Sequence, residues 1–305
     1  MLDYGNQFDE DGLQYVWNSH SLSSWLKCPR YYQYTVIEGY RGRNTHFEFG
    51  GWYAGALQTF YTARAAGADR EEAIRAAVRF ALIESWNHDR DPEGVRIPGT
   101  GAPWDSAHNL KDRGTLIRTI VWYFEEFKTD LPVLTFNGAP AVELRVSLEI
   151  DDGLILAGTL DRVVTYDDSP WVMDQKTTGT TITPRYFEQW KPNTQMSTYT
   201  FLGNATFAES VRGVVIDAAQ IAVGFTRFTR GTTARTNGEL EEWYDGAMSA
   251  FHAARAATRE QRFPMNPESC HNYGGCAFRQ ICSRSPEVRK NFLAAAFTQQ
   301  KKETN

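Results

Sequence analysis

GTLDRVVTYDDSPWVMDQKTT, residues 158–178, has the pattern of a β-hairpin with charged residues near its open end. Two apolar, β-branched runs flank the turn-forming sequence DDSP at 167–170, which predicts paired antiparallel strands. Side chains alternate between the faces of a strand, so Asp174 and Lys176 are expected on the same face. Asp161 on the other strand is expected to meet Asp174. The hairpin therefore predicts a cluster of two carboxylates and one ammonium group.

This predicted cluster has the composition of a hard oxygen site. Asp161 and Asp174 supply carboxylates, and the backbone carbonyl of Gln175 is able to turn toward them although its side chain points away. Mg²⁺ or Mn²⁺ is the natural occupant, with water and a substrate phosphate in the remaining positions. Such an ion activates bound water and neutralises a phosphodiester, and Lys176 would stabilise the developing charge or orient the water. On spacing alone, a surface hairpin with a structural Asp–Lys ion pair is an equal alternative.

The rest of the chain predicts helices before the hairpin and alternating strands and helices around and after it. Apolar periodicity indicates that most of the first 130 residues are helical, with helices at 21–36, 50–64, 68–88 and 110–128. The later predictions are strands at 141–150 and 211–228 and helices at 184–203 and 239–262. This order favours an α/β core with a helical insertion.

Composition limits the classes of protein to which the chain can belong. Its 305 residues correspond to two domains or to one large domain with insertions, and 42% hydrophobic with 23% charged residues is typical of a globular protein. A net charge of −5 argues against a protein that coats nucleic acid through bulk charge, although a local basic groove is compatible with it. The first residues lack the features of a signal peptide, and no run of 18 apolar residues occurs. We therefore expect a cytoplasmic protein without membrane attachment.

The four cysteines are too few for a disulfide scaffold in a chain of this length. Cys270, Cys276 and Cys282 follow one another with five intervening residues each, and Cys28 lies near the other end of the chain. Four thiolates can hold an iron–sulfur cluster or a zinc ion. The loose spacing favours a cluster over zinc, and unrelated buried cysteines are the remaining alternative. A cluster would tie the N-terminal helix to the C-terminal segment.

Five sequence elements, in order, resemble the RecB-type nucleases of the PD-(D/E)XK superfamily, in the iron–sulfur branch. That branch includes the CRISPR-associated iron–sulfur exonucleases, the AddB nuclease domain and many phage-encoded exonucleases. The resemblance extends from Ser19 to Cys282. The five elements are SHSLSSWLKCPRYYQY, GTLDRV with Asp161, DQKTT with Asp174 and Lys176, QMSTY with Gln195 and Tyr199, and the C-terminal cysteine triplet.

The resemblance implies a restriction-endonuclease-like α/β fold with a mixed sheet. In that organisation residues 1–305 form a single nuclease domain, and an iron–sulfur cluster clamps the C-terminal segment. The parts would be a helical insertion at 50–135, a catalytic α/β core at 140–228 and a cysteine segment at 263–283 that joins Cys28.

The resemblance also implies the site and its cofactors. Asp161, Asp174 and Gln175 would hold Mg²⁺ or Mn²⁺, and Lys176 would act on the attacking water. Gln195 and Tyr199, four residues apart on one helix face, would help form the site and contact the DNA strand. A 4Fe–4S cluster would be bound by the four cysteines, Cys28, Cys270, Cys276 and Cys282.

Two positions depart from the family pattern. Ala54 occupies the place of a metal-binding histidine, and Gln58 occupies the place of a glutamate in the same helix. His46 lies too early in the sequence to replace that histidine on the same helical face. Glu143, on the strand before Asp161, is a candidate for the compensating acid. A solvent-facing role for Glu143 is an equal alternative.

Two functional hypotheses follow. The first is a metal-dependent DNA exonuclease that acts on single strands or free ends in recombination, repair or phage DNA processing, with a recombination or helicase protein as partner. Trp52, Tyr53 and Trp190 would stack on bases or, more simply, pack in the core. The alternative is a catalytically inactive DNA-binding subunit of a recombination complex that keeps the fold and the cluster. The complete set of Asp161, Asp174 and Lys176 favours the enzyme.

Overall fold

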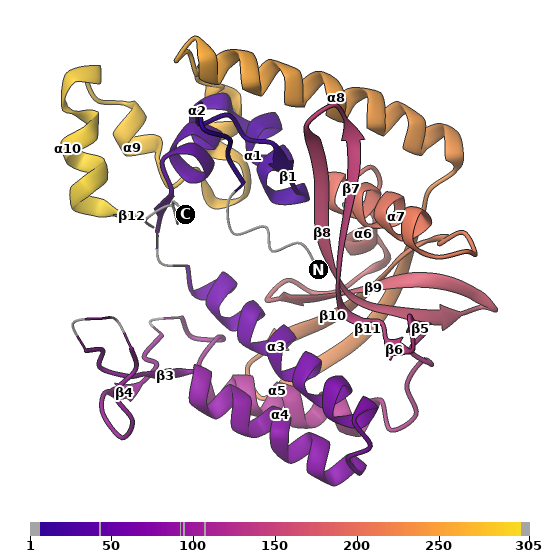
Figure 1. Cartoon of the computed structure of the whole chain (residues 1–305). Helices are drawn as coiled ribbons and strands as arrows, with labels where there is room; N and C mark the ends of the chain where they lie inside the picture. The colour runs from indigo at the N-terminus through magenta and orange to yellow at the C-terminus, as the bar shows by residue number, and fades with distance from the viewer. Residues whose placement is uncertain (1–6, 43, 92, 94, 107, 300–305) are drawn as a thin grey trace.

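A six-stranded mixed sheet lies at the centre of the computed structural model, which describes residues 7–299 except 43, 92, 94 and 107 (Figure 1). The strands follow the order β1-β8-β9-β10-β11, and β7 pairs with β8. β9 and β10 are parallel, as are β1 and β8, whereas the other pairs are antiparallel. The strands are β1 (Val16–Trp17), β7 (Val142–Asp151), β8 (Leu154–Tyr166), β9 (Ser169–Thr178), β10 (Gly213–Ala222) and β11 (Phe225–Ala234).

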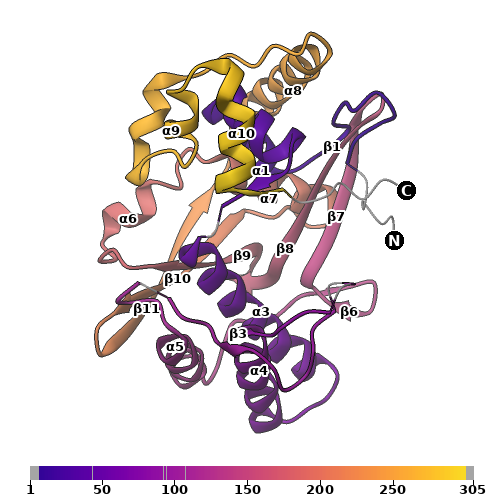
Figure 2. The same ribbon diagram turned by 90° about the vertical axis from the view of Figure 1, so that its left-hand side faces the viewer.

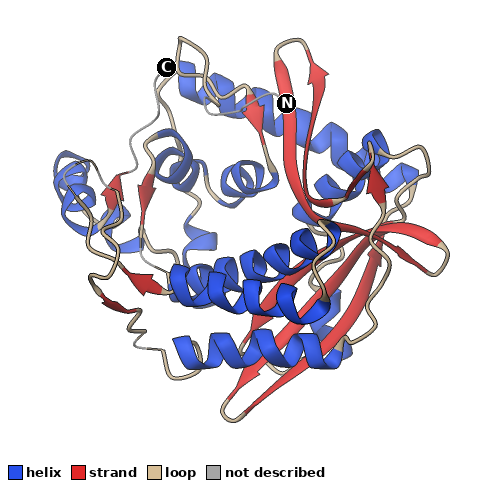
Figure 3. Ribbon diagram, turned by 60° about the horizontal axis from the view of Figure 1, so that its bottom comes forward, coloured by secondary structure: helices blue, strands red, loops and turns tan. Residues whose placement is uncertain are grey.

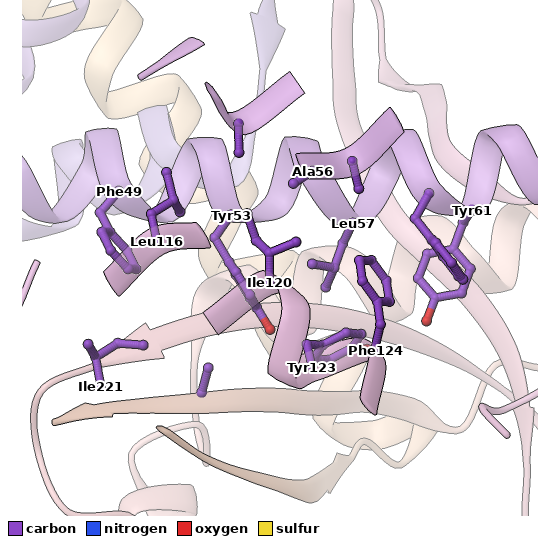
Figure 4. Packing of buried hydrophobic residues seen from close by; sticks show 14 of the residues in the cluster. Phe49, Tyr53, Ala56, Leu57, Tyr61, Leu116, Ile120, Tyr123, Phe124 and Ile221 are labelled. Carbon is purple, nitrogen blue, oxygen red and sulfur yellow. The ribbon is translucent and has the colours of Figure 1, made fainter. Parts of the chain in front are cut away.

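Three helices cover one face of this sheet, as Figures 1 and 3 show. They are α3 (Thr45–Ala65), α4 (Arg70–Glu84) and α5 (Arg113–Glu126). α4 lies within the helix predicted at 68–88. Its start is capped, because the Asp69 side chain accepts from the N–H of Glu72 and the Glu72 side chain accepts from the Asp69 N–H. Figure 4 shows side chains of α3 and α5, among them Tyr53 and Ile120, in one apolar cluster with Ile221 of β10.

The opposite face of the sheet carries α7 (Thr194–Thr206), whose Met196 and Tyr199 pack on apolar residues of β8, β9 and β10. α8 (Asn237–Arg259) packs beside α7 and the N-terminal helix α1 (Ser19–Lys27). The mixed sheet with helices on both faces confirms the α/β prediction. No helix in the described part of the chain has the length and apolar character that crossing a membrane requires.

The two ends of the described chain lie side by side, and Figures 1 and 2 both place α9 and α10 near the N-terminal helices. The Lys27 carbonyl at the end of α1 accepts from the side chains of Asn266 and Ser269. The remaining N-terminal elements are α2 (Pro29–Tyr32), a π-helical turn (Gln33–Ile37) and β2 (Tyr40–Arg41). The C-terminal ones are a 3₁₀ helix (Pro267–Gly274), α9 (Arg279–Cys282), α10 (Pro286–Ala296) and β12 (Thr298–Gln299).

Three predicted elements are interrupted in the structure. The predicted helix at 184–203 is two helices, α6 (Pro184–Glu188) and α7, because Pro192 lacks a backbone N–H and disfavours helix at the residue before it. The predicted strand at 211–228 is the hairpin of β10 and β11, which turns at Gly224 with φ of 78°. The predicted helix at 21–36 breaks at Pro29 for the same reason as at Pro192. Three small strand pairs complete the fold: β3 (Trp86–Asn87) with β4 (Ala102–Pro103), β5 (Thr135–Phe136) with β6 (Ala139–Pro140), and β2 with β12.

Candidate active site

The two candidate metal-binding carboxylates lie where β8 and β9 separate. The strands pair from Tyr166 and Ser169 at the turn up to Arg162 and Met173, so the next residues along are Asp161 and Asp174. The Gln175 N–H donates to Asp161 Oδ2 at 3.1 Å, which ties the first carboxylate to the strand that carries the second. Asp174 is only 2% exposed. The structure thus brings the two carboxylates together at a fork in the sheet.

Lys176 links this pair to α7. Its Nζ lies 2.5 Å from Asp174 Oδ2 and donates to Gln195 Oε1 at 3.1 Å. Gln195 Nε2 in turn donates to the Tyr199 hydroxyl at 3.0 Å. The Asp174 side chain is buried, and the Lys176 ammonium is its ion-pair partner among the described residues. Lys176, Gln195 and Tyr199 therefore form one connected chain beside the carboxylates.

The electrostatics of the pair favour a cation. Burial raises the pKa of Asp161 to about 7, and the neighbouring charge of Asp174 adds to this shift while the Gln175 N–H opposes it. Burial also raises the pKa of Asp174, against the opposing influence of Lys176. Two buried carboxylates this close resist simultaneous ionisation. A divalent cation between them would remove that repulsion.

The described residues contain no group of three or more His, Cys, Asp or Glu side chains arranged to hold a metal ion. An ion at the fork would therefore rely on Asp161, Asp174 and the Gln175 carbonyl, with water and a substrate phosphate completing its coordination. This fits Mg²⁺, which binds through one or two carboxylates and keeps several waters. The donor set is compatible with Mg²⁺ or Mn²⁺.

Glu143 lies across from Asp161 on β7. Val142 pairs with Arg162 and Leu144 with Leu160, so Glu143 falls opposite Asp161 in the register. Its φ of 48° is unusual for a residue other than glycine, and such backbone strain clusters at functional sites. Burial raises the pKa of Glu143, and its charge contributes to the raised pKa of Asp161. The Glu143 side chain is half-buried, and its negative charge acts on Asp161.

The positions that depart from the family pattern lie on α3. Ala54 is half-buried and Gln58 is exposed. His46, near the start of the same helix, is exposed, and its ring contacts the ring of His108 edge-on at 4.9 Å. α3 crosses β9 and contacts it at Thr177, because a side chain added at Gly50 would come within 3.6 Å of Thr177 Oγ1.

The aromatic residues that the sequence offers as base-stacking candidates differ in position. Tyr53 is fully buried against Tyr123, so it is a core residue. Trp52 is half-buried and packs edge-on against Trp104. Trp190 lies beside the site, with Lys176 Nζ 5.5 Å from its ring centroid.

A buried ionic network on the other face of the sheet was missed by the sequence analysis. Arg162, 1% exposed, contacts Asp130 at 3.0 Å and Asp217 at 3.4 Å. Arg230 contacts the same two carboxylates at 2.7 and 3.2 Å, and the Tyr123 hydroxyl donates to Asp217 at 2.6 Å. Arg162 directly follows Asp161, so the network fixes the backbone that presents the first carboxylate. The one sequence signal was Asp217, a charge inside an otherwise apolar strand.

The four cysteines come from both ends of the described chain and are free thiols. Cys28 is buried, and the Asn266 N–H donates to its Sγ at 3.3 Å. Burial raises the pKa of Cys276, and the nearby thiols of Cys270 and Cys28 add to the shift. The pKa of Cys282 is likewise raised by burial and by Cys276 and Cys28. The Cys276 thiol is thus influenced by Cys28 and Cys270, and the Cys282 thiol by Cys28 and Cys276.

The raised pKa of Asp161 predicts pH-dependent metal binding. An ion can bind this carboxylate only after its proton leaves, so affinity should rise with pH and level off above about pH 7. We expect Mn²⁺ to bind about fivefold more weakly at pH 6 than at pH 7, because the ionised fraction of a carboxyl with a pKa of about 7 falls by that factor. Calorimetric titrations in two buffers of different ionisation enthalpy measure both affinity and proton release. An affinity that stays constant from pH 6 to pH 8 would contradict this prediction.

Comparison with known proteins agrees with this geometry. Residues 17–283 match the family model of the PD-(D/E)XK nuclease superfamily. No curated protein matches the sequence. A solved structure from Eubacterium rectale, of a protein to which exonuclease activity has been attributed, aligns with 93% of this chain and 94% of its own, with a TM-score of 0.51 and 10% identity. At 10% sequence identity this similarity shows a shared fold. The chain belongs to the PD-(D/E)XK nuclease superfamily.

Proposed function

We propose that this protein is a metal-dependent DNA exonuclease whose centre is the fork between β8 and β9. The observation that carries the proposal is the convergence of two buried carboxylates, Asp161 and Asp174, with Lys176 beside them. The proposed setting is recombination, repair or phage DNA processing in the cytoplasm, together with a recombination or helicase partner. Single strands or free ends of DNA are the proposed substrate.

The residues at the fork have different proposed roles in phosphodiester hydrolysis. Asp161, Asp174 and the Gln175 carbonyl would hold Mg²⁺ or Mn²⁺, which when bound would act as a Lewis acid on the water and the phosphate. Lys176 has its ammonium next to Asp174 and is placed to orient the water or to stabilise negative charge on the phosphate oxygens. Gln195 accepts from Lys176, and Tyr199 accepts from Gln195, so α7 holds the ammonium in position. Glu143 is the proposed third acid of the site.

The proposal is tested by cleavage of end-labelled DNA with Mn²⁺ or Mg²⁺. We expect the protein to degrade linear DNA and to leave circular single strands intact, with no activity in EDTA. Lys176→Ala should abolish cleavage, whereas Lys128→Ala should not, because the Lys128 side chain is 69% exposed and pairs with Glu125 at the end of α5. Cleavage of circles would indicate an endonuclease. DNA binding without cleavage by the folded parent protein would favour the inactive DNA-binding subunit.

The second part of the proposal is a structural 4Fe–4S cluster at Cys28, Cys270, Cys276 and Cys282. Its support is the proximity of four free thiols from the two ends of the chain. The described cysteines do not form a group of three or more ligands around a single metal ion, but a cluster is larger than one ion and separates its thiolate ligands further. Bound there, it would tie α1 to the segment that follows α8.

We expect anaerobically purified protein to be brown and to contain iron and acid-labile sulfide in equal amounts. Cys276→Ser should remove the colour and lower the Tm, because a thiolate ligand and the closure between the chain ends are both lost. Ser283→Ala is the matched control, since Ser283 is exposed and its hydroxyl donates only to the Arg279 carbonyl of the same helix. Stoichiometric zinc in place of iron, or colourless protein from anaerobic cells, would contradict the cluster.

A further inference from the structure

Lys111 is a buried lysine that the proposed chemistry leaves unexplained. It lies just before α5 and is 2% exposed. Its Nζ donates to Thr177 Oγ1 at 3.4 Å and lies 5.4 Å from the centroid of the Phe49 ring. Within the described part of the chain it forms no ion pair. Burying an ammonium without a carboxylate is costly, so such a group calls for an anion that the described residues do not supply.

The ammonium contacts Thr177, on the face of β9 opposite the carboxylates of the candidate active site. Thr177 follows Lys176 on β9 and presents its side chain on the opposite side of that strand. Gly50 of α3 lies against Thr177, and a side chain added at the neighbouring Gly51 would meet nothing within 4 Å. Gly51 is exposed, and Gly50 and Thr177 are half-buried. These three residues form what we call the glycine patch, where the backbone of α3 is open to close approach by a ligand.

A charge in this position acts on the glycine patch more strongly than a surface lysine would. Its field passes through protein of low effective dielectric and is screened less by salt than the field of an exposed charge. Burial lowers the pKa of Lys111 to about 8, so the ammonium is mostly charged at neutral pH. An anion on the patch would supply the missing counter-charge without entering the protein interior.

We propose that Lys111 holds a phosphate group of the DNA strand on the glycine patch, at the same end of β9 that carries Asp174 and Lys176. The inference rests on the proposed nuclease function and adds a second phosphate subsite to it. Lys111 is a binding residue in this account, because the bond that breaks lies at the fork and not at the patch. The ligand is a phosphodiester of a nucleic acid strand.

The test is the salt dependence of DNA binding, measured by fluorescence anisotropy with a labelled single-stranded oligonucleotide in EDTA. Lys111→Met keeps the length and the apolar stem against Phe49 but removes the charge. We expect about tenfold weaker binding, as for one charge-assisted contact, and a slope of log K against log[KCl] that is smaller by about 0.7. Lys111→Arg should retain most of the affinity. Lys128→Met, at an exposed lysine, should leave affinity and slope unchanged.

Thermal unfolding separates this role from a structural one. Removal of an unpaired buried charge should leave the Tm of Lys111→Met equal to or above that of the parent. Unchanged affinity and slope in Lys111→Met would overturn the subsite while leaving the nuclease proposal intact, and so would a lower Tm without a change in slope. A folded parent that neither binds nor cleaves DNA would overturn the nuclease proposal, and the subsite with it.

Discussion

Asp174→Asn should reduce metal-dependent DNA cleavage about a thousand-fold or more. The substitution keeps the shape of the side chain but removes a charged ligand, and the metal contribution to such a reaction is several kcal/mol. Lys176 would also lose the carboxylate that lies 2.5 Å from its Nζ. The measurement is the initial rate of end-label release at saturating Mn²⁺. Loss of less than tenfold would place the metal elsewhere.

The same site predicts a gain in stability when a carboxylate is neutralised. The pKa of Asp161 is raised from 3.8 to about 7 in the folded protein, so the folded state binds this proton more tightly than the unfolded chain does. Stability of the metal-free protein should therefore fall as pH rises from about 4 to about 7. Asp161→Asn should reduce that slope, with the part due to Asp174 remaining, and raise stability at pH 8 by up to about 4 kcal/mol. Urea unfolding in EDTA at pH 5 and pH 8 measures the effect, and destabilisation at pH 8 would contradict it.

Asp217→Ala should destabilise the protein by about 3–5 kcal/mol, the expected cost of breaking a buried ion pair from one side. Asp217 is contacted by both Arg162 and Arg230 and by the Tyr123 hydroxyl, so its loss leaves buried positive charge only partly compensated by Asp130. Against a typical total stability of about 5–15 kcal/mol, this is a large fraction.

The milder Asp217→Asn keeps an acceptor for the Tyr123 hydroxyl and should cost less, which leaves a folded protein for comparison. Glu241→Ala, an exposed acid on α8, is the control and should change stability by less than about 0.5 kcal/mol. Urea unfolding at pH 7 gives the free energies. If Asp217→Ala cost less than about 1 kcal/mol, the network would not be an important part of the fold.

The centre of the fold was predictable because its signal is local. The sequence DDSP between two apolar runs fixes the hairpin of β8 and β9, and strand alternation places Asp174 and Lys176 on one face. The proximity of Gln195 and Tyr199 was predictable because residues four apart lie on the same face of a helix. The structure brings these residues together, whereas their catalytic roles remain predictions.

The parts that escaped prediction depend on distant partners or on single residues. The network of Arg162, Asp217 and Arg230 joins strands that are far apart in sequence, so no local pattern reveals it. The burial of Lys111 was not predictable either, because its neighbours Phe49 of α3 and Thr177 of β9 are distant in sequence. The sequence predicts one strand where the structure has the hairpin of β10 and β11, because Gly224 is the single turn signal between the two strands.

The proposed chemistry requires one divalent ion between Asp161 and Asp174. Mn²⁺ binding measured by electron paramagnetic resonance tests this requirement most directly. The parent protein should remove free Mn²⁺ signal with one site at the fork, in addition to any metal held by the cysteines. Asp161→Asn and Asp174→Asn should each weaken that binding at least tenfold, while Glu241→Ala should not. Equal Mn²⁺ affinity in the parent and in both asparagine variants would contradict the account.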